Sequence, residues 1–176
     1  MRLMSIPILL LLMLSGCNKE SPIVLADSEE REELISQIDQ LKLENEQLKS
    51  QLNEKEKELE IENEALRTTM NLSLTVLSAM NNKDYAYIAS VSSTDVIVKE
   101  VEKKILFNHP NSSHEVSIND EKYLLEKLEF RFYDFEDKEK MTIGFAEHFF
   151  EGHSTLYFEF IKQDGEWLFN NFITNA

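Results

Sequence analysis

The fold of this chain is decided by residues 28–70, which read SEEREELISQIDQLKLENEQLKSQLNEKEKELEIENEALRTTM. The stretch contains no Gly or Pro. Its commonest residues are Glu, Leu, Lys and Gln, and all four are strong helix formers. Ser28 is a suitable N-cap, and acidic residues follow it in the first turns, where the helix dipole favours negative charge. The composition predicts one long helix from Ser28 to about Met70, reaching about 60 Å.

Apolar residues recur in this stretch with the heptad spacing of a coiled coil. We refer to the row of a and d positions as the heptad face. Its expected seam residues are Leu34, Ile38, Leu41, Asn45, Leu48, Leu52, Leu59 and Leu66.

Asn45 lies at an a position between Leu41 and Leu48, and a lone Asn at a fixes register and favours a parallel dimer. Glu44 at g and Lys49 at the following e would pair across such a dimer. These features predict a homodimer through the coiled coil.

The second half of the stretch is less regular, because Lys55 and Glu62 occupy d positions. Three other interpretations therefore stay open. The segment could form a single solvated helix, an arm that folds back on the rest of the chain, or one helix of a coiled coil with another envelope protein.

Residues 70–176 have another character, because every Phe, every Tyr and the one Trp lie after residue 72. The helix is expected to continue to Met80, and a second short helix, Tyr85 to Val91, is expected to be capped by Asp84. Residues 95–107 suit either a short amphipathic helix or the start of a strand. Residues 109–119 are expected to form a loop, and residues 120–127 one more helical turn.

The C-terminal part alternates apolar and polar residues in four segments, 128–135, 141–150, 155–162 and 166–174. Glu151-Gly152 and Asp164-Gly165 are hairpin signals between them. The pattern predicts an α+β fold: a long N-terminal coiled-coil helix, then a small antiparallel-sheet domain with packed helices. The expected buried face consists of Leu128, Phe130, Phe132, Ile143, Phe145, Leu156, Phe158, Phe160, Trp167, Phe169 and Ile173.

Two short motifs give the domain a resemblance to a known family. They are Asn-Asn-Lys-Asp-Tyr-Ala-Tyr-Ile-Ala-Ser at residues 81–90 and Lys-Gln-Asp-Gly-Glu-Trp at residues 162–167. Together with the order of elements they are similar to the NTF2-like cone fold over residues 70–176, although Ile88 stands where Leu is usual. The resemblance implies a cone-shaped head; family members include isomerases and dehydratases, while the variant in bacterial lipoproteins usually has no known catalytic role.

The N-terminus carries a second motif, Leu14-Ser15-Gly16-Cys17, directly after an apolar run that follows Arg2. It resembles the lipobox of bacterial lipoproteins, and Cys17 is the one cysteine in the chain. The resemblance implies export, attachment of diacylglycerol to Cys17, cleavage between Gly16 and Cys17, and often acylation of the new amine with a fatty acid such as palmitate. An uncleaved anchor is disfavoured, since a spanning helix needs about 20 apolar residues, as is a plain secretory peptide.

These observations predict a chain in four parts. They are a lipoprotein signal peptide (1–16), a tether (17–27), the coiled-coil helix (28–69) and the NTF2-like α+β domain (70–176). The localisation that follows is the extracytoplasmic face of the cell membrane, with membrane lipid bound through Cys17.

The charge balance excludes some partners. The chain has 33 acidic and 18 basic residues, and loss of Arg2 with the signal leaves 17 basic residues, so the net charge becomes 17 − 33 = −16. This balance argues against nucleic-acid binding, which requires basic residues to neutralise phosphates, and against electrostatic adhesion to anionic lipid.

Candidate catalytic side chains are few. Tyr133, Asp134 and His148 are the candidates. Asp134 lies two residues from Phe132, in the series expected to face inward, where it would be a pocket acid. A residue at this position more often marks the exposed end of the strand, here beside Glu136 and Asp137. No glycine-rich phosphate loop or Gly-x-Ser-x-Gly motif occurs. We expect no catalytic residue and no cofactor.

The histidines form two pairs. His109 and His114 flank a loop sequence rich in Asn and Ser, and His148 and His153 flank the turn at residues 151–152, with Glu147 nearby. The spacing fits no common zinc site, so we expect no metal.

The function expected from the sequence is a membrane-anchored, non-catalytic binding or scaffolding module, raised and dimerised by its coiled coil, with a possible envelope protein as partner. The alternative is a small-molecule binder, or an isomerase- or dehydratase-type enzyme, that uses a pocket in the cone.

Overall fold

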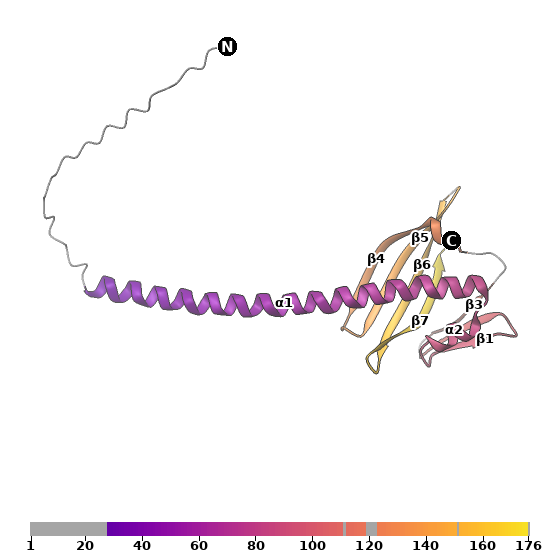
Figure 1. The fold of residues 1–176 in the computed structure, drawn as a ribbon, viewed down its shortest axis with the longest axis horizontal. Helices are drawn as coiled ribbons and strands as arrows, with labels where there is room; N and C mark the ends of the chain where they lie inside the picture. The colour runs from indigo at the N-terminus through magenta and orange to yellow at the C-terminus, as the bar shows by residue number, and fades with distance from the viewer. Residues whose placement is uncertain (1–27, 111, 119–122, 151, 176) are drawn as a thin grey trace, which may run out of the picture. The chain divides into compact units, whose positions relative to one another are not determined.

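The computed structural model describes residues 28–110, 112–118, 123–150 and 152–175. The fold is α+β, as the sequence predicts: a long helix is followed by two antiparallel sheets (Figure 1). Contacts within the chain divide it into two units, residues 1–49 and residues 50–176. The expected signal peptide and tether, with Gly16 and Cys17, lie outside the described residues.

The helix predicted from residue 28 is confirmed, and it runs as one element, α1, from Ser28 to Asn82. It ends at Lys83, whose positive φ of 58° stops the helical path. Asp84 then caps the short helix α2 (Tyr85–Ser90), because its Oδ1 accepts a hydrogen bond from the Tyr87 N–H at 3.0 Å. The predicted cap is therefore confirmed.

Four strands form one sheet in sequence order, as the alternating pattern predicts: β4 (Leu128–Glu136), β5 (Lys140–Phe149), β6 (Gly152–Gln163) and β7 (Glu166–Asn175). Figure 1 shows them side by side in an up-and-down meander. The turn between β6 and β7 is the predicted Asp164-Gly165 pair, and positive φ values of 52° and 88° give it the twist a two-residue hairpin requires.

A second sheet contains β1 (Val96–Lys99), β2 (Lys104–His109) and β3 (Ser112–Ser117). The stretch 95–107, left open between helix and strand, is thus a hairpin. The loop predicted for residues 109–119 is wrong, since residues 112–117 pair with β2 over their whole length. Within the expected turn at 120–127, residues Leu125–Lys127 form a 3-10 helix.

The core joins α1 to both sheets. In Figure 1 the end of α1 nearer Asn82 lies across the four-stranded sheet, and side chains from these elements form one buried cluster. Its largest fully buried members are Phe107, Phe158, Phe160, Phe169, Phe172, Leu77, Ile88, Ile105, Met141, Ile143, Leu156 and Val76.

Two irregularities in the strands change which side chains face this core. The register of β4 shifts between Phe130 and Phe132, and the ladder between β6 and β7 shifts after Glu159. Each shift moves the following residues to the opposite face. Phe132 and Ile173, predicted to be buried, are therefore exposed. The predicted burial of Phe130 is wrong as well: its ring lies against Phe145, but on edge strand β4 it is as exposed as Phe132.

Candidate functional site

The heptad face is open in the single chain. Its apolar members between Leu34 and Leu59 are each 50–59% exposed. Leu66, in contrast, packs against the core. The first part of the heptad face is thus an apolar row for which this chain supplies no covering residues among those described.

The same heptad count runs on into the core. Continued past Leu66, it assigns d, a, d and a to Thr69, Ser73, Val76 and Met80, and all four are buried. Below residue 60 the row is therefore free for a partner, and beyond residue 65 the chain's own sheets occupy it.

The two polar d positions lie at the transition. Glu62 Oε1 accepts a hydrogen bond from the Tyr133 hydroxyl of β4 at 2.9 Å. Lys55 Nζ lies 2.6 Å from Glu58 Oε2, and the same carboxylate has Lys138 Nζ 3.7 Å from its other oxygen. Glu62 thus takes part in the contact between α1 and β4, whereas Lys55 pairs with a neighbouring residue on α1.

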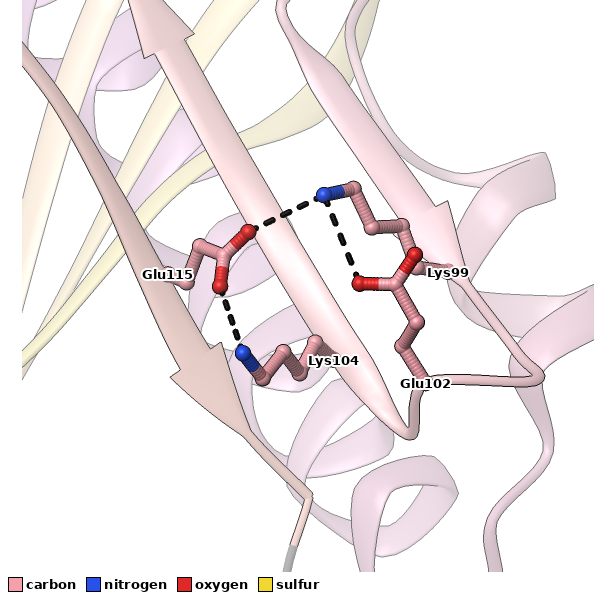
Figure 2. A network of polar contacts seen from close by, with 4 residues as sticks. All are labelled: Lys99, Glu102, Lys104 and Glu115. Carbon is pink, nitrogen blue, oxygen red and sulfur yellow. Dashed lines mark hydrogen bonds and ion pairs between the residues drawn. The ribbon is translucent and has the colours of Figure 1, made fainter.

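The three-stranded sheet carries an exposed polar network (Figure 2). Glu115 on β3 accepts hydrogen bonds from Lys104 Nζ at 2.7 Å and Lys99 Nζ at 3.0 Å, and Glu102 lies 3.6 Å from the same Lys99. Hydrogen bonds from Lys104 and Lys99 lower the pKa of Glu115 to about 2. The network ties three strands together, and its charges already pair with one another, so it offers no free group for catalysis.

The three candidate catalytic residues do not form one site: Tyr133 and Asp134 are neighbours on β4 that face opposite sides of the sheet, and His148 lies on β5 beside the other end of β4. Tyr133 faces α1, where its hydrogen bond to Glu62 raises its pKa. Asp134 shares a face with Phe132, as expected, but that face is turned away from the core, because Asp134 pairs with Thr142 while buried Ile143 pairs with Tyr133. Asp134 is therefore not a pocket acid but an exposed residue near the end of β4, the more common of the two positions expected for it, and the shift between Phe130 and Phe132 places it there.

One buried acid escaped the sequence reasoning. Glu147 on β5 is only 4% exposed, and its carboxylate accepts a hydrogen bond from the Leu124 N–H at 2.8 Å. Burial, and then the charge of Glu147, raises the pKa of Tyr123 to about 12. Asn81 holds the same segment, because its side-chain amide exchanges two hydrogen bonds with the Tyr123 backbone. Period-two counting from buried Phe145 would have placed Glu147 on the inner face.

The four histidines do not converge. His148 Nε2 lies 2.7 Å from Glu129 Oε2, and the ring of His153, its cross-strand neighbour, is 5.9 Å away. His114 stacks on Phe107, and His109 lies at the end of β2. Within the described parts of the chain, no three His, Cys, Asp or Glu side chains are grouped closely enough to hold a metal ion.

Comparisons with protein-family models, with curated proteins and with solved structures find no match for this chain. Among the described residues, no helix has both the length and the apolar character that crossing a membrane requires.

Proposed function

We propose that this chain is a lipid-anchored lipoprotein of the extracytoplasmic face of the cell membrane, acting as a non-catalytic binding or scaffolding module. The observation that carries the scaffolding part is the exposed apolar row on the heptad face between Leu34 and Leu59. An apolar row of this length on a solvated helix is costly to leave uncovered, and a second copy covers it most simply.

The dimer we infer is a parallel coiled coil restricted to about Leu34–Leu52. Asn45 sets the register, and Glu44 pairs with Lys49 of the other copy. Downstream of this range, the polar d residues and the packing of Leu66 against the core favour contacts within one chain.

Sedimentation equilibrium of residues 18–176 tests the dimer. Leu41→Lys and Leu48→Lys at d positions should give monomers, because each introduces two facing charges into the seam. Leu43→Lys is the matched control: Leu43 is as exposed as Leu41, at 58% against 59%, but lies at f, outside the seam. Loss of the dimer in the control as well, or a monomeric parent chain, would contradict the coiled coil.

The anchor rests on the lipobox-like motif, and its test is independent of the dimer. A bacterial host fed labelled palmitate should label the full chain but not a Cys17→Ser variant. The labelled chain should partition with membranes, because each buried methylene contributes about 0.8 kcal/mol to lipid anchoring. Equal labelling of both chains would remove the anchor and leave the coiled coil untouched.

For the head, residues 70–176, we infer an NTF2-like cone. Besides the two sequence motifs, a contact between β7 of the four-stranded sheet and the segment that leads into β1 of the three-stranded sheet supports it. The Phe169 N–H donates to the Val91 carbonyl and the Ser93 N–H to the Phe169 carbonyl, both at 2.8 Å. An experimental structure of the head in which these two sheets form one continuous curved surface would support the cone.

The alternative function, a ligand-binding or isomerase-like pocket in the head, is favoured by one observation, the buried carboxylate of Glu147. A pocket that uses this acid should release its ligand when Glu147 becomes Gln, while the dimer stays intact. A thermal-shift screen of small hydroxy and keto compounds against the parent and the variant separates the two functions. Ligands that stabilise only the parent would favour the pocket.

A further inference from the structure

A groove of about 600 Å³ lies beside α1, and none of the heptad face residues between Leu34 and Leu52 lines it. One wall is the stretch of α1 from Ile61 to Thr75, and the other comes from α2 and from the end of the β6–β7 hairpin. Its apolar surface includes Leu72 and the aromatic rings of Tyr87 and Trp167. The groove therefore offers aromatic surface next to the side of a helix.

The α1 wall carries a row of polar side chains. Glu64, Thr68, Asn71 and Thr75 follow one another at intervals of three or four residues, so they share one side of the helix. The row is about 16 Å long at 1.5 Å per residue. All four side chains are exposed, and those of Glu64, Thr68 and Asn71 make no hydrogen bond or ion pair with the described residues.

The opposite wall adds one charge of each sign. Lys162 Nζ lies 5.7 Å from the centre of the Trp167 ring, a cation–π contact that holds the ammonium against the indole. Glu166 lines the groove, and its carboxylate has no partner among the described residues. With Glu64 the groove has two carboxylates and one ammonium, so its charge does not suit an anionic ligand.

An apolar partner helix fits this groove poorly. It would cover the row on α1 and leave Thr68, Asn71 and Glu64 without water or hydrogen-bond partners, which is costly for each buried polar group. A ligand rich in hydroxyls satisfies these groups, while its C–H faces cover the aromatic rings. We propose that the groove binds a short linear saccharide, with pyranose faces against Trp167 and Tyr87 and hydroxyl or acetamido groups on the polar row.

The proposal depends neither on the lipid anchor nor on the dimer, so its test uses soluble residues 18–176 and tri-N-acetylchitotriose as the probe. Trp167 is the one tryptophan of the chain, and its fluorescence should shift as the saccharide is added. Calorimetry should give one site per chain. Asn71→Ala should weaken binding about fivefold, the effect of losing one neutral hydrogen bond.

Asn63→Ala is the matched control, because Asn63 is an exposed asparagine of the same helix that does not line the groove. It should bind like the parent chain, and circular dichroism should show the same helix content in both variants. Absence of a Trp167 response at saturating saccharide would overturn the proposal. The proposal would also be overturned if Asn71→Ala bound the saccharide as tightly as the parent chain does. The same holds if the groove bound an acetylated pentapeptide of alternating Thr and Leu but not the saccharide.

Discussion

Substitution of Gly144, in the middle of β5, probes the packing on the outer face of the four-stranded sheet. The ring of Phe132 lies directly over it: a Cβ added at Gly144 would be 2.3 Å from Phe132 Cε1 and 2.7 Å from Cδ1. No real Cβ tolerates such distances, so Gly144→Ala must push the ring aside. Because Phe132 is 39% exposed, the ring has room to move outward, away from Tyr157, whose ring centre is 5.8 Å away.

The expected magnitude follows from two opposing effects. Overpacking of this kind costs about 1–3 kcal/mol, while replacing Gly by Ala inside a strand returns about 0.5–1 kcal/mol. Gly144→Ala should therefore lower the free energy of unfolding by about 1 kcal/mol. In a Phe132→Ala background the clash is gone, and the same change should raise the free energy of unfolding by about 0.5–1 kcal/mol.

Urea unfolding of the four chains of this cycle, followed by Trp167 fluorescence, measures the coupling directly. The coupling energy should equal the clash, about 1–3 kcal/mol. Gly152→Ala is the control for the chemical change alone, because a Cβ there would meet nothing within 4 Å. Equal destabilisation by Gly144→Ala in both backgrounds would refute the position of the Phe132 ring and, with it, the register shift in β4.

Three further predictions concern other parts of the chain. Asn45→Leu should raise the melting temperature of the dimer and loosen its preference for two strands, as thermal melting and sedimentation would show; no change in either would remove Asn45 from the seam. Glu147→Gln should lower the pKa of Tyr123 from about 12 but leave it above 10, because burial, the larger cause, remains; ultraviolet titration of tyrosinate measures this. The carboxyl of Glu115 has a pKa below its ordinary value, so its contribution to stability is complete above pH 4.5 and is lost as pH falls toward about 2. Replacing it with Gln should flatten the acid limb of a stability–pH curve in that window, and an unchanged limb would show that Lys104 does not hold the carboxylate in solution.

Local patterns in the sequence predicted much of the fold. The helix from Ser28 has no Gly or Pro to interrupt it, and the turn at Asp164-Gly165 needs residues that accept positive φ, so both could be located in advance. The alternating strands were equally visible. Their faces were not, because a one-residue shift such as that after Phe130 leaves composition and alternation almost unchanged while it turns Phe132 outward.

Sequence reasoning failed where polar residues take structural positions. The stretch 109–119 predicts a loop because Asn and Ser are frequent in it, yet Val116 and Ile118 alternate with polar residues, and Ile118 is buried. In the sequence, Glu147 stands out only as a neighbour of the pair His148 and His153. Its burial depends on the Leu124 N–H, a contact across 23 residues that no local pattern shows.

The polar d residue Glu62 connects the helix to its head. Each level of the a/d row has room for one neighbour. In the dimer we propose, that neighbour is another copy between Leu34 and Leu52, and from Leu66 onward it is the chain's own core. Glu62 at the boundary already hydrogen-bonds to Tyr133, so extending the coil past it would require breaking that contact and burying a charge. The coil that remains has about three heptads, near the lower limit for a stable pair. Confinement of both copies to one membrane through Cys17 would raise their effective concentration and favour the dimer without any added contact.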